Sequence, residues 1–211
     1  MELTLHHYWR SSCSWRVRWA LQLKGIAYKP VAVNLLKGEQ NDLVYLKLNP
    51  SGQVPCLIID GRALSESTAI LEWLEETYPT NPLLPKDAWL RAEIRSFCQM
   101  IACGIQPLAN LKVQQFVSKE AEKKAEWSNH FVTEGLVPIE TMLRKYSNGA
   151  KAFAFGPEPT MADLYLIPQV YNAMRVNVDM TRFPLAKQVY DNALKTKACD
   201  AAAPHSQEGA Q

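Results

Sequence analysis

The sequence lacks any long apolar run, and this absence excludes one class of protein. No stretch of apolar residues reaches the roughly 18 that a membrane-spanning helix requires. The first residues, Met1-Glu2-Leu3-Thr4, also lack the basic flank and apolar stretch of a secretory signal peptide. We therefore expect neither a membrane partner nor an exported protein.

The sequence also lacks an excess of charge of one sign. It has 23 Lys and Arg against 21 Asp and Glu, a net charge of +2. Even the densest charged run, residues 119–124, mixes both signs and is typical of a solvated helix face. Nucleic-acid-binding proteins usually carry a basic stripe, so we expect no nucleic-acid partner.

Paired cysteines are missing as well. The five cysteines are an odd number, and no two have the spacing of a zinc site or a thioredoxin-type redox site. We therefore expect reduced thiols, a cytoplasmic location and no metal. The cysteines are Cys13, Cys56, Cys98, Cys103 and Cys199.

What is present is an ordinary globular composition, 47% apolar and 21% charged, in two halves of different pattern. Residues 1–80 mix short β-branched runs with helical periodicity and predict the order βαβαββα. Asp60-Gly61 predicts a hairpin turn, and Gly25 a helix stop. The predicted strands are 3–8, 28–33, 54–59 and 62–64, and the helices are 14–24, a weak one ending at 48, and 65–78.

A linker, residues 79–86, is predicted where Pro79, Pro82 and Pro85 interrupt the helical pattern. Beyond it, residues 86–211 predict an all-helical domain without strands. We expect a frayed tail over residues 200–211, because they are small and polar. The expected helices are 87–117, bent near Gly104 and Pro107; 118–146, with Pro138 inside and Ser147-Asn148-Gly149 as its stop; one opened by a capping box at Thr160-Met161-Ala162-Asp163; and 184–197.

The first candidate for chemistry is Ser11-Ser12-Cys13-Ser14, between the first strand and the first helix. Amides at a helix N-terminus stabilise an anion, and a hydroxyl there can donate to a thiolate. Arg10, Arg16 and Arg18 add positive potential, and Cys13 would be a reactive thiol. The alternative is that one serine only caps the helix.

Two further loops are candidates for ligand binding. At Val54-Pro55 a trans bond is the usual isomer, whereas a cis bond would turn the Val54 amide and carbonyl toward a peptide-like ligand. At Glu66-Ser67, either Ser65 or Ser67 is a simple helix cap, or Ser67 binds a carboxylate while Glu66 binds an ammonium. The second arrangement would hold both charged ends of an amino acid.

These motifs together resemble the cytosolic glutathione transferases. The βαβαββα order, the Val-Pro and the Glu-Ser are similar to the thioredoxin-like domain of that superfamily, and the box at 160–163 to the capping box of its helical domain. The run from Ser11 to Arg18 resembles the signature of the zeta class, the maleylacetoacetate isomerases. The resemblance covers residues 3–195. It implies an α/β thioredoxin-like domain, an all-α domain and a homodimer, for which the apolar face from Trp89 to Ile101 could serve, unless that face is core.

The resemblance further implies glutathione as a cofactor. Ser12 would hydrogen-bond the glutathione sulfur, with Ser11 and Cys13 beside it. Two positions depart from the class, Glu66 in place of a usual Gln, and Leu111-Lys112 in place of small polar residues. The other implied site residues are Arg16, Gln40 at the glycyl end, Val54 at the cysteinyl backbone, Glu66 and Ser67 at the γ-glutamyl group, Gln106 and Asn110 from the helical domain, and Arg175 at a substrate carboxylate.

The implied reaction is cis–trans isomerisation of the dicarboxylate maleylacetoacetate to fumarylacetoacetate, in tyrosine and phenylalanine breakdown. Reversible addition of the glutathione thiolate to the alkene would allow rotation and return free glutathione. Maleylpyruvate isomerisation, conjugation or dehalogenation of α-halo acids, and a non-catalytic binding protein stay open. Cys13 could be a nucleophile or a redox thiol, but we expect a helper that orients glutathione, which brings its own nucleophile.

Overall fold

The computed structural model describes residues 1–146 and 152–210, and the chain divides into two compact units. The first unit comprises Met1–Pro82 and the residues from Thr196 onward, and the second unit comprises Leu83–Lys195. The helix stop expected at Ser147-Asn148-Gly149 lies outside the described residues.

A four-stranded mixed sheet forms the centre of the first unit, in the order β2-β1-β3-β4. β1 is parallel to β2 and antiparallel to β3, which is antiparallel to β4. Pro30 lies in the edge strand β2, where its missing amide costs no sheet hydrogen bond. The elements up to Pro82 are β1 (Leu3–His7), α1 (Ser12–Lys24), β2 (Lys29–Ala32), the 3-10 helix η1 (Glu39–Asn41), α2 (Leu43–Leu48), β3 (Cys56–Ile59), β4 (Arg62–Ser65) and α3 (Ser67–Thr77).

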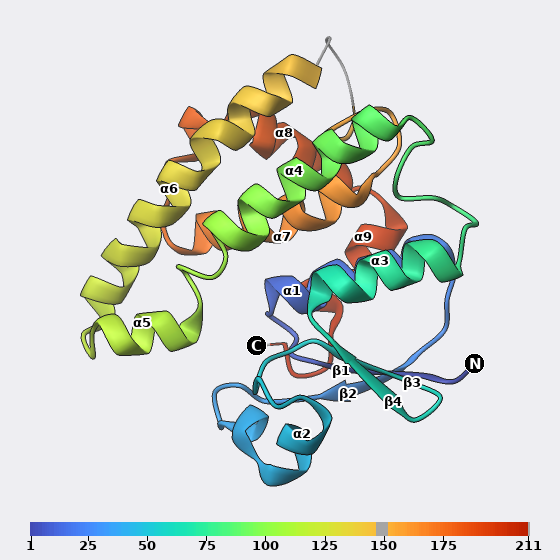
Figure 1. The fold of residues 1–211 in the computed structure, drawn as a ribbon. Coiled ribbons are helices and arrows are strands. Elements are labelled where there is room, and N and C mark those ends of the chain that lie inside the picture. Colours follow the sequence, from blue (N-terminus) through green and yellow to red (C-terminus); the bar gives the residue numbers. More distant parts are fainter. Residues whose placement is uncertain (147–151, 211) are drawn as a thin grey trace. The chain divides into compact units, whose positions relative to one another are not determined.

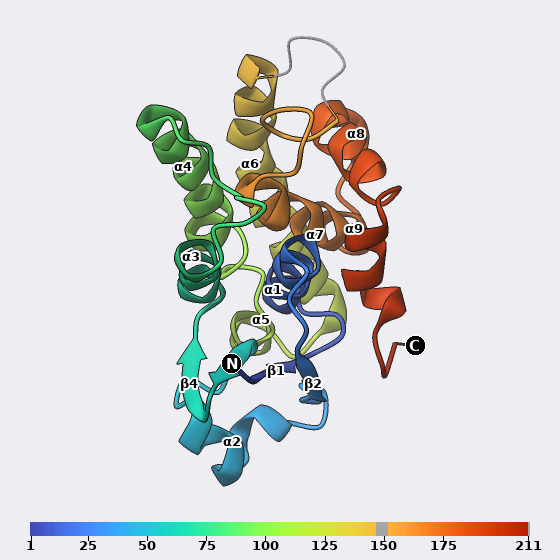
Figure 2. The same ribbon diagram turned by 90° about the vertical axis from the view of Figure 1, so that its right-hand side faces the viewer.

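Helices α1 and α3 cover one face of this sheet, and α2 lies on the opposite face (Figures 1 and 2). Along β1 the side chains alternate, so that Leu3, Leu5 and His7 are buried. Trp19 of α1 and Ile70 of α3 are fully buried with them. The predicted βαβαββα order and thioredoxin-like domain are confirmed.

The C-terminal residues are ordered, so the expectation of a frayed tail over residues 200–211 is wrong for its described part. The helix predicted over residues 184–197 ends at Ala193, and the chain then forms α9 (Lys197–Ala202) and the 3-10 helix η3 (Pro204–Ser206). Cys199, Ala202 and Ala203 are fully buried, and α9 packs against α1. The small side chains of α9 let the two helices approach closely. The same small side chains give this segment no apolar pattern by which the sequence could predict a helix.

The second unit is helical, and its described residues contain no strand. The long helices α4 and α6 each pack against α7, which is largely buried (Figure 1). Pro138 lies inside α6, as predicted. The elements are α4 (Ala88–Gly104), α5 (Leu111–Val117), α6 (Ala121–Tyr146), α7 (Met161–Arg175), the 3-10 helix η2 (Met180–Arg182) and α8 (Pro184–Ala193).

The helix expected over residues 87–117 is two helices rather than one bent helix. α4 ends at Gly104, and Asn110 caps α5 by accepting a hydrogen bond from the Lys112 amide at 3.4 Å. Pro107 between them has no amide to continue a helix. A Cβ on Gly135 of α6 would lie 2.3 Å from Ile105 Cγ1, so a glycine is required where α6 meets this turn.

The helix α7 begins at the predicted capping box. The Asp163 carboxylate accepts hydrogen bonds from the amides of Thr160 and Ala154, both at 2.8 Å. Burial raises the pKa of Asp163 to about 6, and these hydrogen bonds oppose that shift. This group is fully buried and structural.

The apolar face of α4 is mainly core. Ile94, Phe97 and Ile101 are fully buried, whereas Trp89 at the start of the helix is 73% exposed. This face was predicted to be either a dimer surface or part of the core. For these three residues the core prediction is correct.

Candidate active site

The N-terminus of α1 shows which serine caps the helix. Ser11 is the N-cap, and its Oγ accepts a hydrogen bond from the Ser14 amide at 3.2 Å. Ser12 is the first residue of α1, and Ser11, Ser12 and Cys13 are all partly exposed. The capping role therefore falls to Ser11, and Ser12 stands at the positive end of the helix dipole.

Positive charge gathers along the first turns of α1. No acidic residue lies in the first turn, while Arg16 and Arg18 are buried behind it at 1% and 0% exposure. The Arg10 guanidinium lies over the Trp9 ring, 5.2 Å from its centroid. This end of the helix is suited to an anion such as a thiolate.

A second helix N-terminus adjoins the same region. Arg16 Nη1 donates to Ser67 Oγ at 3.2 Å, joining α1 to the first residue of α3. Ser67 is buried, and Glu66 before it has φ 68° and ψ 113°. A non-glycine residue with positive φ is uncommon, and such residues concentrate at functional sites. The structure thus brings Arg16 and the Glu66-Ser67 motif together.

The Val54 segment is held in a defined turn. The Val54-Pro55 bond is cis. The Gln53 carbonyl accepts hydrogen bonds from Tyr45 Oη at 2.5 Å and from Asn49 Nδ2 at 2.7 Å. The Val54 backbone has no recorded hydrogen bond with the residues that the structure describes. Its amide and carbonyl are therefore available to a peptide-like ligand.

Gln40 lies beside this turn. A Cβ on Gly52, whose φ is +62°, would be 3.3 Å from the Gln40 carbonyl oxygen. Gln40 Oε1 is buried and has no hydrogen-bond partner within the described chain. A buried polar atom without a partner is costly, so a bound polar ligand would satisfy it.

Three predicted residues lie in the second unit. Gln106 follows α4 and donates its amide to the Ile101 carbonyl at 2.9 Å, and Asn110 caps α5. Arg175 is the last residue of α7 and is exposed. The parts that these three play toward a ligand of the first unit stay predictions.

The described residues contain neither a metal-ligand cluster nor a membrane-spanning helix. No group of three or more His, Cys, Asp or Glu residues there is placed to hold a metal ion. No helix in the same part of the chain is long and apolar enough to cross a bilayer.

The comparisons with known proteins agree with this geometry. Residues 5–82 match the family model "Glutathione S-transferase, N-terminal domain". The maleylacetoacetate isomerase of Dictyostelium discoideum is 45% identical over 212 residues, covering 98% of this chain and 95% of the relative. The chain belongs to the glutathione S-transferases of the zeta class.

Two solved structures extend the comparison from sequence to fold. A maleyl pyruvate isomerase, a bacterial zeta-class glutathione S-transferase, has a TM-score of 0.95 at 36% identity and covers 99% of this chain and 100% of its own. The maleylacetoacetate isomerase of Anaeromyxobacter dehalogenans 2CP-1, with GSH bound in its active site, has a TM-score of 0.89 at 41% identity. The latter match covers 100% of this chain and 98% of that structure.

In this zeta-class glutathione S-transferase, some residues that support the candidate site were not predicted from the sequence. Tyr45 and Asn49 fix the Gln53 carbonyl, and no local pattern marks them because their partner is a backbone atom. Arg18 was considered only for its charge, although it also makes several hydrogen bonds. The Trp-Arg-Val-Arg-Trp run was the available signal, because arginines between apolar residues of a buried helix need specific partners.

Proposed function

We propose that the chain is a glutathione-dependent maleylacetoacetate isomerase that converts maleylacetoacetate to fumarylacetoacetate. Full-length similarity to maleylacetoacetate isomerases gives the reaction class. The observation that carries the proposal in this chain is the joining of two helix N-termini, at Ser12 and Ser67, by the buried Arg16. Two anionic groups of one ligand could be bound there.

Glutathione fits the residues of the first unit. Its γ-glutamyl group carries an ammonium and a carboxylate, which Glu66 and Ser67 would hold, with Arg16 behind Ser67. Val54 would pair with its cysteinyl backbone. Gln40 would reach the glycyl end of glutathione, whose amide N–H can donate to Gln40 Oε1, a buried acceptor without a partner in the described chain. Its thiol would meet Ser12, with Ser11 and Cys13 beside it.

Residues of this chain would stabilise negative charge on the glutathione sulfur and on the substrate. When bound, glutathione supplies a thiolate that adds reversibly to the cis-alkene and so permits rotation about the carbon–carbon bond. Ser12 donates a hydrogen bond to the sulfur, and the α1 amides and arginines stabilise the anion. Gln106 and Asn110 would contribute to the glutathione site, and Arg175 would meet a carboxylate of the substrate. Cys13 would orient glutathione, a role tested by KM against kcat in Cys13→Ala.

Two finer statements are part of the proposal. A homodimer is favoured because Trp89 stays 73% exposed at the start of α4. A cytoplasmic location is favoured because all five cysteines are free thiols.

Turnover of maleylacetone, a stable analogue of the substrate, tests the reaction. We expect isomerisation that requires glutathione and leaves the free thiol concentration constant. Ser12→Ala should lower kcat/KM about 100-fold, because a hydrogen bond to the reacting anion is lost. Ser118→Ala is the control, since Ser118 Oγ accepts from the Glu120 amide near the start of α6, outside the proposed site. Steady loss of thiol would instead indicate conjugation, and no turnover a binding protein.

Maleylpyruvate isomerisation is the second candidate, because a maleyl pyruvate isomerase is the structure with a TM-score of 0.95. The same assay with both substrates separates the two. A kcat/KM higher for maleylpyruvate would transfer the assignment to that reaction.

A further inference from the structure

Arg18 makes an unusual set of hydrogen bonds inside the first unit. Its side chain is on α1 and fully buried. Nη1 and Nη2 donate to the carbonyls of Tyr8 at 3.3 Å and Trp9 at 3.0 Å, and Nε donates to the carbonyl of Ala202 at 2.9 Å. One guanidinium thus joins the turn ahead of Ser11 to the last turn of α9.

The fourth partner of Arg18 is His7. Nη1 lies 3.3 Å from His7 Nδ1, and because arginine only donates, Nδ1 accepts. Burial and the charge of Arg18 lower the pKa of His7 to about 4, so the ring is neutral at pH 7 and keeps this lone pair. Arg18 has no carboxylate partner among the described residues. Backbone dipoles and one ring nitrogen compensate its charge.

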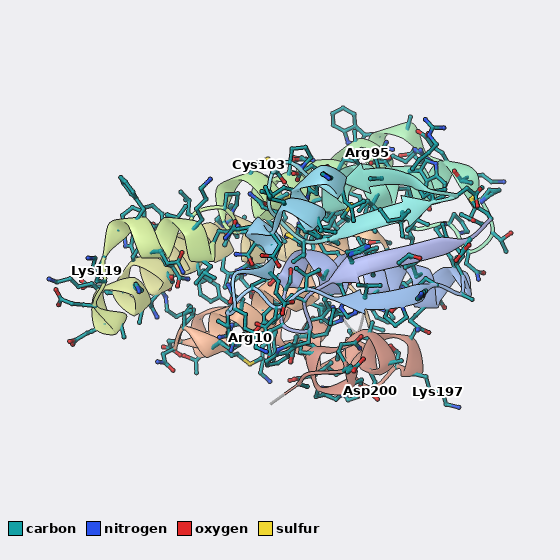
Figure 3. The ribbon with its side chains drawn as sticks, turned by 90° about the horizontal axis from the view of Figure 1, so that it is seen from below. Arg10, Arg95, Cys103, Lys119, Lys197 and Asp200 are labelled. Carbon is teal, nitrogen blue, oxygen red and sulfur yellow. The ribbon has the colours of Figure 1, made fainter. Side chains whose placement is uncertain are left out.

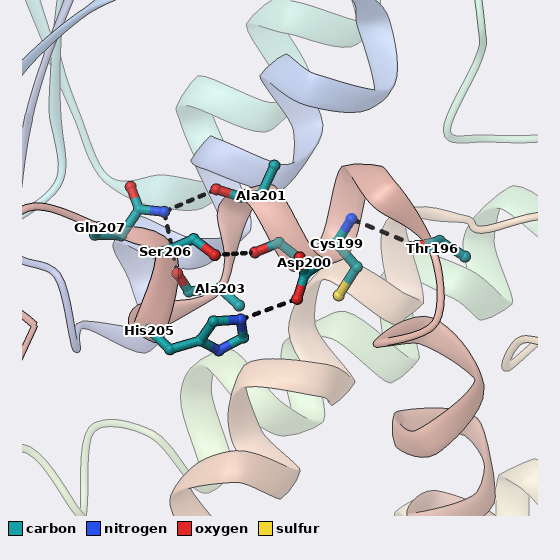
Figure 4. Close-up of polar contacts among 8 residues, drawn as sticks. All are labelled: Thr196, Cys199, Asp200, Ala201, Ala203, His205, Ser206 and Gln207. Atoms are coloured by element: carbon teal, nitrogen blue, oxygen red, sulfur yellow. Dashed lines mark hydrogen bonds and ion pairs between the residues drawn. The ribbon is translucent and has the colours of Figure 1, made fainter.

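The C-terminal segment, residues 196–207, satisfies its own polar groups (Figure 4). Thr196 Oγ1 accepts from the Cys199 amide at 3.4 Å, which caps α9. Gln207 Nε2 donates to the carbonyls of Ala201 and Ala203 at 2.8 and 3.0 Å, and Ser206 Oγ donates to that of Asp200 at 2.8 Å.

The carbonyl of Ala202 lies between these internally satisfied groups and is the one that Arg18 binds. The exposed charged side chains of α9, Lys197 and Asp200, lie on its outer side (Figure 3). The inner side of the segment therefore faces α1 and Arg18.

The turn that Arg18 holds leads directly to the proposed thiol site. The Ser11 amide donates to the Tyr8 carbonyl at 3.1 Å, and the Tyr8 amide donates to Ser14 Oγ at 3.4 Å. A shift of Tyr8 or Trp9 would therefore move Ser11 and Ser12. A displacement of about 1 Å in a catalytic group can cost about 100-fold in rate.

We propose that Arg18 is a positioning residue for the turn of residues 8–12, which leads to Ser12, and that the C-terminal segment holds Arg18 in place. This proposal rests on the proposed glutathione chemistry of Ser12. It makes α9 part of the glutathione-binding apparatus, although α9 touches no proposed ligand. A change at α9 would reach the thiol through Arg18 and the carbonyls of Tyr8 and Trp9.

The first test replaces Arg18 by lysine, which keeps the charge but carries its donors on one nitrogen and cannot reproduce the guanidinium fork that spans the carbonyls of Tyr8, Trp9 and Ala202. We expect a KM for glutathione about tenfold higher. We also expect the pKa of bound glutathione, measured from thiolate absorbance against pH, to rise by about one unit. The matched control is Lys24→Met, because Lys24 is a buried cation of the same helix that bonds Glu75, Tyr78 and Asn81 instead.

The control separates positioning from stability. Both variants should have a lower Tm, but only Arg18→Lys should change the KM and the thiol titration. Equal values of both quantities in Arg18→Lys and the wild type would overturn the proposal.

The second test uses the wild-type chain and hydrogen exchange. Binding and loop order are linked, so saturating glutathione should slow exchange of the α9 amides as well as those of residues 11–15. Slowing at residues 11–15 with none in α9 would overturn the proposal. If the wild type neither binds glutathione nor turns over maleylacetone, the proposed function fails instead. In that case the link between Arg18 and α9 is tested by hydrogen exchange without ligand. The α9 amides must exchange faster in Arg18→Lys than in Lys24→Met, and equal exchange would overturn the link.

Discussion

The two units bury charge of opposite sign. Among the described residues, the buried cations of the first unit are Arg16, Arg18 and Lys24, all on α1, and Lys24 pairs at 2.8 Å with the nearly buried Glu75 carboxylate. The buried charged residues of the second unit are both anions, Glu140 and Asp163. Arg18 collects backbone carbonyls, whereas Glu140 accepts from the amides of Leu185 and Ala186, both at 3.0 Å.

This difference separates a binding role from an architectural one. The buried anions occupy helix N-termini, where amides have no partner within the helix, and so they fix where α7 and α8 begin. Of the buried cations, Arg16 and Arg18 lie behind the start of α1 and raise the local potential where an anionic sulfur would bind, whereas Lys24 ends that helix and pairs with Glu75. We therefore expect changes to the anions to affect stability, and changes to Arg16 and Arg18 to affect glutathione.

The largest effect is expected for Asp163→Asn. The side-chain NH2 group of the asparagine would replace one Asp163 oxygen and would face the N–H and O–H donors of Thr160 or Ala154. The free energy of unfolding, measured by urea denaturation, should therefore fall by about 3 kcal/mol. The control is Asp179→Asn, because exposed Asp179 also accepts from a threonine amide and hydroxyl, those of Thr181. It should lose less than about 1 kcal/mol. A changed KM for glutathione in folded Asp163→Asn would break the comparison.

A smaller loss is expected for Glu140→Gln, about 2 kcal/mol, because one of two charge-assisted hydrogen bonds to the start of α8 is lost. Glu134→Gln on the exposed side of α6 is the control and should change stability by less than about 0.5 kcal/mol. Equal losses in the two variants would show that the buried carboxylate does not fix α8.

The smallest net effect comes from pH, because the two contributions have opposite signs in the two units. The lowered pKa of His7, about 4, means that its stabilising contribution is lost as pH falls below about 6.5, by about 2 kcal/mol at pH 5. The raised pKa of Asp163, about 6, means that its contribution grows as pH falls through 6, by about 1 kcal/mol at pH 5.

Unfolding free energies at pH 7 and pH 5 check these signs. From pH 7 to pH 5, His7→Asn, which keeps an acceptor for Arg18, should lose less stability than the wild type. Asp163→Asn should lose more. The reverse order would contradict both assignments.

Much of the fold follows from local patterns. Pro30 marks the edge strand, Asp60-Gly61 has the positive φ values of a tight turn, and Thr160 with Asp163 opens α7. The sequence could not indicate that α9 packs on α1, because that contact joins residues about 180 positions apart through small side chains. The break between α4 and α5 was underestimated, since a helical pattern continues on both sides of Pro107.

The site was predictable where each residue has a local signature. Ser11 as a cap, and Glu66-Ser67 at a helix start, follow from short motifs. The bond from Arg16 to Ser67 depends on tertiary packing, and so do the two bonds that hold the Gln53 carbonyl. The isomer at Val54-Pro55 also could not be read from the sequence, because both isomers are compatible with the same residues.

The return of the C-terminal segment to the first unit has a consequence for biosynthesis. The ribosome makes Met1–Pro82 first but delivers Thr196 and the following residues only after the whole second unit. At about 5–20 residues per second, those roughly one hundred intervening residues take about 5–20 s. During that interval Arg18 lacks the Ala202 carbonyl, and the surface of α1 that α9 covers is open to solvent or to a chaperone. The unit synthesised first is therefore the last to be completed.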